Sequence, residues 1–197
     1  MGVGIAYVGV CLCLGILADR LHRARYEAEQ RALTDTLTTL PNRRHAILIL
    51  ERAFAAAARG VPVCVALFDL DNFKDFNDRH GHVAGDHVLM LFGQVLRGYT
   101  RAMDLSARFG GEEFLSVLLD GDEEGARVFA ERVRERLKAA ELAYGPVTVS
   151  CGVAVYNGDM RTIEDLVAAA DQALYAAKKG GRDQVVLADP LLVSDPA

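Results

Sequence analysis

The sequence has no excess of positive charge, because 22 lysine and arginine residues stand against 27 aspartate and glutamate residues and the net charge is −5. A general nucleic-acid partner requires a basic surface, so this class is excluded, although a single nucleotide held through a metal ion is not. Low-complexity stretches and internal repeats are also missing. The 197 residues therefore suffice for one globular domain with a hydrophobic core and little else.

Cysteine is scarce as well. The four cysteines are Cys11, Cys13, Cys64 and Cys151. Their spacing does not match that of a metal site. Two lie in the N-terminal apolar run and two in segments that we expect to be strands, so we predict reduced, buried thiols in a cytosolic domain.

Residues 1–18 carry no charged side chain, and basic residues follow them from Arg20 onward. Eighteen apolar residues are the lower limit for a membrane-spanning helix. By the positive-inside tendency, we expect a transmembrane segment in the inner (cytoplasmic) membrane, with the following domain in the cytoplasm. A buried or disordered tail is the alternative. Residues 19–34 are alanine-rich, charged and free of glycine and proline, so they predict a linker helix.

The stretch 108–114 reads Arg-Phe-Gly-Gly-Glu-Glu-Phe and lies between two short apolar segments. Adjacent glycines in this position predict the turn of a β-hairpin over residues 105–119. Glycine tolerates positive φ and lets a ligand approach the backbone. Two glutamates beside the bare backbone suit a phosphate chelated by a metal ion. The alternative is an ordinary hairpin tip with solvated carboxylates.

A second pair of acids follows the apolar run Val63–Phe68, which predicts a strand buried on both faces. Because side chains alternate along a strand, Asp69 and Asp71 are expected to point to the same face. Carboxylates at a buried strand end require a cation or hydrogen bonds. Mg²⁺ uses one or two protein carboxylates and takes its other ligands from water and phosphates. We favour Asp69 as a ligand, whereas Asp71 has the alternatives of capping a turn or pairing with Lys74.

Helical and strand patterns alternate along the rest of the chain. We expect helices over residues 43–59, 85–99, 123–142 and 162–179, and further strands over residues 147–156 and 183–188. Thr162 and Asp165 have the spacing of a capping box. This order predicts an α/β (α+β sandwich) fold, with helices flanking a central mixed or antiparallel sheet of about five strands.

Several spaced blocks between residues 34 and 188 occur together in one order. They are Asp35–Arg43, Phe68–Lys74, Asn77–Asp78, Gly81–His82, Gly85–Asp86, Arg108–Phe114, Val149–Ala154, Ala169–Lys178 and Gly181–Arg182. Together they resemble the GGDEF domain of diguanylate cyclases. The resemblance implies a catalytic domain over residues 35–190, followed by a tail at 191–197. It also implies a βααββαβ fold similar to nucleotidyl cyclases and to the palm of polymerases.

The resemblance further implies an enzyme that condenses two GTP molecules to cyclic di-GMP and releases two pyrophosphates. Mg²⁺ or Mn²⁺ would be the cofactor, and a homodimer would be required because each domain offers one GTP half-site. The implied metal ligands are Asp69, Glu112 and the backbone carbonyl of Leu70. Glu113 would help to bind metal or to deprotonate the attacking hydroxyl, which makes Asp69, Glu112 and Glu113 the catalytic residues.

The implied substrate contacts divide into base and phosphate contacts. Asn77 and Asp86 would accept hydrogen bonds from guanine, with a turn residue and a first-turn helix acid as their respective alternatives. Lys74, Lys178 and Arg182 would hold the triphosphate, beside the bare backbone of Gly110 and Gly111. Lys178 also lies where a helix C-terminus favours cations regardless of any ligand. The phenylalanines Phe73, Phe109 and Phe114 are expected in the core.

A regulatory site is implied by Arg101 and Asp104, which match the RxxD inhibitory site where the product binds, and by Arg132, which matches its secondary arginine. An exposed arginine–aspartate pair is the alternative. Two departures from the family pattern are Thr39, in place of a glycine, and Asp183, in place of an asparagine. Asp183 is expected to weaken phosphate binding slightly, because it lies beside Arg182.

Two other functions remain open at this point. One is a non-catalytic sensor that binds GTP or cyclic di-GMP; degenerate domains usually lose a carboxylate at the tip, whereas Glu112 and Glu113 are both present. The other is a cyclase or polymerase that uses a different base, against which Asn77 and Asp86 argue.

Overall fold

The computed structural model describes residues 20, 33–140 and 142–189. The expected transmembrane segment, most of the linker helix and the tail at 191–197 lie outside the described residues. Among the residues described, no helix has both the length and the apolar character needed to cross a membrane. The chain divides after Thr34 into two units, and the second, which begins at Asp35, carries the fold below.

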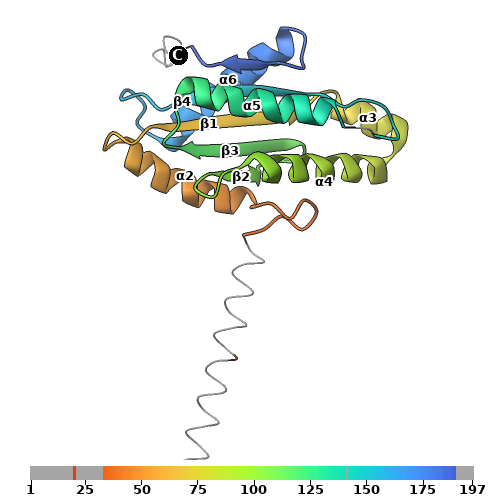
Figure 1. Ribbon diagram of the computed structural model, residues 1–197, viewed down its shortest axis with the longest axis horizontal. Coiled ribbons are helices and arrows are strands. Elements are labelled where there is room, and N and C mark those ends of the chain that lie inside the picture. The colour runs from red at the N-terminus through yellow and green to blue at the C-terminus, as the bar shows by residue number, and fades with distance from the viewer. Residues whose placement is uncertain (1–19, 21–32, 141, 190–197) are drawn as a thin grey trace, which may run out of the picture. The chain divides into compact units, whose positions relative to one another are not determined.

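Five strands form one mixed sheet in the order β2-β3-β1-β4-β5 (Figure 1). Their bounds are β1 Val63–Leu70, β2 Leu105–Arg108, β3 Glu113–Leu119, β4 Val149–Val155 and β5 Val185–Leu187. The central strand β1 pairs antiparallel with β3 and with β4, and β2 pairs antiparallel with β3. Only β5 runs parallel to its neighbour, β4, within this described sheet. The predicted class and strand number are confirmed.

Helices cover both faces of the sheet, as the pattern of β1 requires. Every residue of β1 is buried, and its alternate side chains enter two hydrophobic cores. One core packs β1 under α3 (Phe73–His80), α4 (His82–Tyr99) and α5 (Glu123–Lys138). The other packs it under α2 (Arg43–Ala57) and α6 (Ile163–Lys179). The predicted strand with two buried faces is therefore confirmed.

The helices differ from the prediction by one additional helix and by shifted boundaries. The short helix α3 was not predicted, because its eight residues include three aspartates or asparagines, which favour turns. The helix predicted from residue 85 begins at His82, one residue after Gly81, and the helix predicted to residue 142 ends at Lys138. The capping box of Thr162 and Asp165 is present at the start of α6 and is confirmed.

Close packing of α6 on β4 sets the position of one side of the candidate site. Gly152 lies in β4, and a Cβ atom there would lie 2.0 Å from the carbonyl oxygen of Ala170 and 2.3 Å from the nitrogen of Leu174. Real Cβ atoms essentially never approach backbone this closely, so only glycine allows α6 to pack on the strand at this point. The same helix carries Lys178 at its C-terminal end.

Candidate active site

The two predicted acidic segments meet at one end of the sheet. The end of β1 and the start of β3 are paired, with Asp69 opposite Glu113. The amide of Leu70 donates to the carbonyl oxygen of Glu112 at 3.4 Å. Residues far apart in sequence are thus brought together by the antiparallel ladder, as the metal-site hypothesis requires.

A pocket of about 190 Å³ lies at this end of the sheet. Its lining comprises Asp69, Leu70, Asp71, Asn72, Phe73, Lys74, Asp75, Glu112, Lys178 and Arg182. We call this the candidate pocket. It contains the three implied metal ligands and the three implied phosphate-binding cations. Glu113, Asn77, Asp86 and the two tip glycines are not among these lining residues.

Two of the acids that line the pocket, Asp69 and Glu112, have unfavourable electrostatic surroundings. Burial raises the pKa of Asp69, against the hydrogen bond and positive charge of Lys178, and Asp71 raises it further. Burial also raises the pKa of Glu112, and the charges of Asp69 and Glu113 add to that increase. Asp69 is 6 % exposed, and the Lys178 ammonium lies 2.9 Å from its carboxylate. Burial therefore disfavours the negative charge that these two acids bring to the site.

This donor set fits a Mg²⁺ ion that takes most of its ligands from elsewhere. Within the described ranges, no cluster of three or more histidine, cysteine, aspartate or glutamate side chains could hold a metal alone. Two carboxylates with raised pKa values, next to a backbone segment at Leu70, nevertheless match the one or two carboxylates typical of a Mg²⁺ site beside phosphates. The residues present fit the implied ion.

The N-terminal end of α3 faces the same pocket, which the sequence did not predict. Asn72 precedes the helix at φ 53° and, among the residues described, its side chain makes no capping hydrogen bond. The first amides of a helix are unsatisfied unless capped, and they attract anions. Asn72, Phe73 and Lys74 all line the pocket. Backbone N–H donors at the start of α3 therefore lie beside Lys74, the residue that is expected to hold the triphosphate.

Asn77 and Asp86 lie on α3 and α4, which pack together. The Asn77 side-chain oxygen is buried and has no hydrogen-bond partner within the described part of the chain. A Cβ atom on Gly85 would lie 1.9 Å from that oxygen, so the glycine makes room for the amide. Asp86 is exposed one residue further along α4. An orphaned acceptor is the expected state of a group that awaits a donor from a ligand.

The hairpin tip (residues 109–112) differs from the prediction in one respect. Neither Gly110 nor Gly111 has a positive φ, so left-handed backbone does not explain the pair. The amides of Phe109 and Gly110 both donate to the carbonyl oxygen of Glu113, at 2.8 and 3.1 Å. A Cβ atom on Gly110 would lie 2.4 Å from the Glu113 carboxylate. Gly110 therefore makes room for the Glu113 side chain.

Arg108 fixes the tip, a role that was not predicted from the sequence. Its guanidinium donates to the carbonyl oxygen of Gly111 at 2.7 Å and to both carboxylate oxygens of Asp35 at 3.3 Å. Asp35 is itself held by the amide and hydroxyl of Thr38. Arg43 stacks on the ring of Phe109, 4.6 Å from its centroid. The first block of the resemblance thus clamps the hairpin tip.

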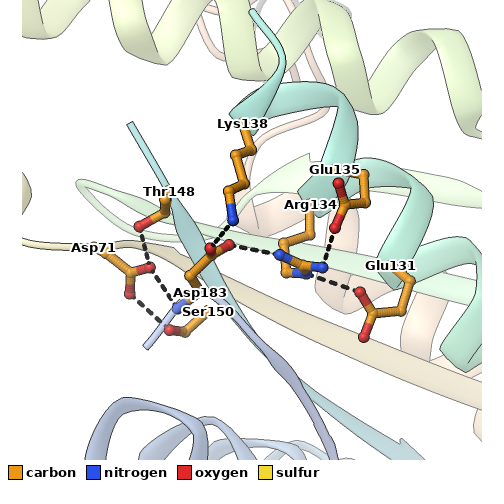
Figure 2. A network of polar contacts seen from close by, with 8 residues as sticks. All are labelled: Asp71, Glu131, Arg134, Glu135, Lys138, Thr148, Ser150 and Asp183. Atoms are coloured by element: carbon orange, nitrogen blue, oxygen red, sulfur yellow. Dashed lines mark hydrogen bonds and ion pairs between the residues drawn. The ribbon is translucent and has the colours of Figure 1, made fainter. Parts of the chain in front are cut away.

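Asp71 is structural, although it lines the pocket. Its carboxylate accepts hydrogen bonds from Thr148, Ser150 and the amide of Asp183, at 2.7, 2.6 and 3.0 Å (Figure 2). These contacts explain an acid that is 8 % exposed. Neither a metal nor Lys74 is needed to explain its burial.

The expectation for Asp183 is not supported by its contacts. Its carboxylate accepts from Arg134 at 2.7 Å and from Lys138 at 2.6 Å, both on α5 (Figure 2). Burial alone would raise the pKa of Asp183, but the hydrogen bonds from Lys138 and Arg134 outweigh it and lower the pKa. The negative charge is paired with α5 and is not left to oppose phosphates beside Arg182.

Residues 32–184 match the family described as the diguanylate cyclase GGDEF domain. The chain belongs to this family. It is 39 % identical over 176 residues to the diguanylate cyclase DgcP of Pseudomonas aeruginosa, a match that covers 87 % of this chain and 26 % of DgcP.

Solved structures agree with the GGDEF assignment. The coiled coil and GGDEF domain of DgcB from Caulobacter crescentus, in complex with c-di-GMP, has a TM-score of 0.89 at 30 % identity, covering 93 % of this chain and all of that one. The active GGEEF domain of a diguanylate cyclase from Vibrio cholerae has a TM-score of 0.73 at 33 % identity, covering 76 % and 98 %. The chain spans between a quarter and half the length of the first curated relatives it matches.

The implied product-binding residues of the GGDEF domain lie away from the candidate pocket's lining. Arg101 follows α4 and is exposed, and Arg132 is exposed on α5. Asp104 has a structural contact, because its carboxylate accepts from the amide of Leu119 at 2.9 Å. Its own amide donates to the carbonyl oxygen of Arg101 at 3.0 Å, which fixes the turn between the two residues.

Proposed function

We propose that this GGDEF domain condenses two GTP molecules to cyclic di-GMP. One observation carries the proposal: a single pocket joins two carboxylates of raised pKa to three cationic side chains and the uncapped start of α3. That arrangement suits a triphosphate chelated to a divalent cation.

The phosphate side of the site consists of positive groups from three elements. Lys74 comes from the first turn of α3, Lys178 from the last turn of α6, and Arg182 from the loop that follows. The charge of Lys178 already acts on both acids, since it lowers the pKa of Asp69 and of Glu112. A cation in this position is suited to a phosphate that shares the metal ion.

We propose Mg²⁺ as the cofactor, with Mn²⁺ as a substitute, held by Asp69, Glu112 and the carbonyl of Leu70. The ion would neutralise charge on the phosphates when bound. The domain's own residues then orient one nucleotide so that its α-phosphorus faces the 3′-hydroxyl of the other. Glu113, held beside Gly110, is the candidate to accept the hydroxyl proton.

Base selection is assigned to Asn77 and Asp86. An amide oxygen and a carboxylate accept from the N–H groups of guanine, a pattern that adenine does not offer. The buried, unpartnered oxygen of Asn77 supports this choice.

Three further parts of the proposal concern assembly and regulation. Two copies of the chain are required, because one domain holds one GTP and the product joins two. The product slows the enzyme by binding Arg101, Asp104 and Arg132. Residues 1–18 anchor the protein in the cytoplasmic membrane, with the GGDEF domain in the cytoplasm.

Incubation of the purified chain with GTP and Mg²⁺, followed by chromatography, tests the activity. We expect cyclic di-GMP and pyrophosphate in a ratio of one to two, no dinucleotide from ATP, and loss of product in Asp69→Asn. Asp159→Asn, in an exposed loop, is the control and should keep full activity. GTP binding without any product from the wild-type chain would contradict catalysis and favour the sensor function.

A further inference from the structure

We propose that Arg134 on α5 is a positioning residue for the phosphate side of the candidate pocket and that it acts through Asp183. The inference rests on the proposed function, since it takes Arg182 to face the nucleotide phosphates. Arg134 itself is not among the residues that line the pocket. It is 49 residues from Asp183 in sequence and donates to its carboxylate at 2.7 Å.

The loop that presents Arg182 has an unfavourable backbone. Gly181, Arg182 and Asp183 have φ values of 117°, 66° and 47° in succession. Residues other than glycine rarely adopt this left-handed region, and they remain there only when surrounding contacts hold them. The amide of Arg182 donates to the carbonyl oxygen of Ala177 at 3.0 Å, which ties the loop to α6 on one side. On the other side the loop is held by Asp183 and by Gln184, whose carbonyl oxygen accepts from the amide of Cys151 at 3.0 Å.

Asp183 is held at both its backbone and its side chain. Its amide donates to Asp71 at 3.0 Å, and its carboxylate accepts from Arg134 at 2.7 Å and Lys138 at 2.6 Å (Figure 2). Asp71 is anchored on β4 through Thr148 and Ser150. The loop is therefore fixed between the sheet and α5, and it joins the pocket to a helix that does not line it.

Arg134 is the more constrained of the two cations. Its side chain is 13 % exposed, compared with 49 % for Lys138. It also donates to Glu131 at 2.8 Å and contacts Glu135, so its guanidinium bridges three acids (Figure 2). A half-buried, multiply bonded arginine holds its partner in one geometry, whereas an exposed lysine has more freedom.

The charge of Asp183 decides what the loss of Arg134 would do. Asp183 is adjacent to Arg182. Without Arg134 its carboxylate would keep only the exposed Lys138, so that part of its charge would oppose a triphosphate and attract the Arg182 guanidinium. Arg134 therefore has two effects: it fixes the loop and it removes a competing negative charge. Both effects favour phosphate binding.

The test compares Arg134→Met with Arg136→Met in the full chain. Methionine keeps the length of the side chain without its charge, and Arg136 is an exposed arginine on the same helix. We expect half-saturating GTP to rise about fivefold in Arg134→Met relative to Arg136→Met, the upper range for an ion pair near the surface. Calorimetric binding of a GTP analogue that resists cleavage between its α- and β-phosphates, with Mg²⁺, should show the same shift.

Rescue and salt dependence distinguish this role from a merely structural one. Adding Asp183→Asn to Arg134→Met should restore part of the affinity, because the carboxylate that only Lys138 still pairs is gone and asparagine tolerates left-handed backbone. The difference between Arg134→Met and its control should shrink between about 0.05 M and about 0.5 M salt, because salt screens the repulsion. Loss of packing alone predicts neither result.

The outcomes separate this inference from the proposed function. If the wild-type chain binds the GTP analogue but makes no cyclic di-GMP, the proposed catalysis fails. The affinities of the variants for the analogue then still test the role of Arg134. Equal GTP affinity in Arg134→Met and Arg136→Met overturns the positioning role. An Arg134→Met loss that is as large with Asp183→Asn as without it overturns the action through Asp183. If Arg134→Met does not fold, the comparison of Arg134→Lys with Arg136→Lys decides, with a smaller rise expected and equal affinity again overturning the proposal.

Discussion

At the scale of single residues, Asp69 and Glu112 are placed where their charges are unfavourable without a cation. Burial raises the pKa of both, and each of them is close to a further acid. Lys178 compensates only in part, because it pairs directly with Asp69 at 2.9 Å. Such strain is common where a protein binds an ion, since groups arranged for the ligand destabilise the unliganded fold.

Glu112→Gln should therefore stabilise the domain and abolish its response to Mg²⁺. Because the folded-state pKa of Glu112 is raised, its contribution to stability is present at low pH and is lost as pH rises through the raised value. At neutral pH, glutamine removes a destabilising charge, worth up to about 1 kcal/mol, or roughly 2–4 °C in Tm. Thermal unfolding with and without Mg²⁺ measures this, and activity should fall about 100-fold or more.

The matched control for that variant is Glu51→Gln, an exposed glutamate on α2. It should leave the Tm, the Mg²⁺ response and the activity unchanged. The gain in stability of Glu112→Gln should also vanish on acidification, because the native glutamate then becomes protonated. A lower Tm for Glu112→Gln at neutral pH, or an undiminished Mg²⁺ response, would refute the assignment of Glu112 as a ligand.

Asn77 offers a test of base recognition. Its buried oxygen has no partner among the described residues, so Asn77→Ala removes an orphaned acceptor and not an internal hydrogen bond. We expect stability to be unchanged or slightly higher, while the KM for GTP rises about fivefold, as for the loss of one hydrogen bond of about 1 kcal/mol. Steady-state kinetics and thermal unfolding of Asn77→Ala and of Asp78→Ala, its exposed neighbour, check this. An unchanged KM would place the guanine elsewhere.

At the scale of elements, the sequence predicted those whose patterns are strong. Six of the eight buried residues of β1, Val63–Phe68, form an uninterrupted apolar run, the hairpin has two adjacent glycines, and α6 begins with a capping box. In each case a local rule agrees with the tertiary environment. The helix α3 was missed because only Phe73 in it is buried and its remaining residues carry a polar, turn-like pattern.

The acids and cations that line the candidate pocket were predictable from the sequence. The contacts that hold these residues in place were not. Asp69, Glu112, Lys74, Lys178 and Arg182 belong to blocks that a family resemblance marks, and all five line the pocket. The supporting contacts depend on side chains that meet only after folding. Arg134 reaches Asp183 across 49 positions and Arg108 reaches Asp35 across 73, and neither pair has a local signal in the sequence.

Gly152→Ala tests whether the packing of α6 on β4 sets the site. The added Cβ atom would lie 2.0 Å from a backbone oxygen of α6, which cannot move away as a flexible side chain could. We expect a loss of stability of about 1–3 kcal/mol, as for overpacked cores, and lower activity because α6 carries Lys178. Denaturant unfolding and kinetics measure both. Gly158→Ala, where no atom lies within 4 Å, is the control, and equal stability of the two variants would contradict the packing argument.

At the scale of the whole molecule, the proposed product-binding residues are not among those that line the candidate pocket. They nevertheless lie on or beside elements whose other residues support the pocket. The helix α5 carries exposed Arg132, and two residues further along it carries Arg134, which holds the loop of Arg182. Arg101 and Asp104 lie between α4 and β2, and Asp104 is tied to the end of β3. A ligand that bridges these surfaces would therefore contact elements that also support the candidate pocket.

Product inhibition is the property that tests this arrangement, and Arg101→Ala is the cleanest variant. Arg101 is exposed, whereas replacing Asp104 would also remove the hydrogen bond from Leu119 and disturb β3. We expect Arg101→Ala to keep an initial rate near that of the wild type and to continue at that rate as cyclic di-GMP accumulates. Full time courses, with and without added cyclic di-GMP, measure the difference.

Arg59→Ala, which replaces an exposed arginine after α2, is the control and should remain inhibited as the wild type is. If added cyclic di-GMP slows Arg101→Ala as strongly as it slows Arg59→Ala, the product does not act through Arg101 and the proposed inhibitory site is wrong.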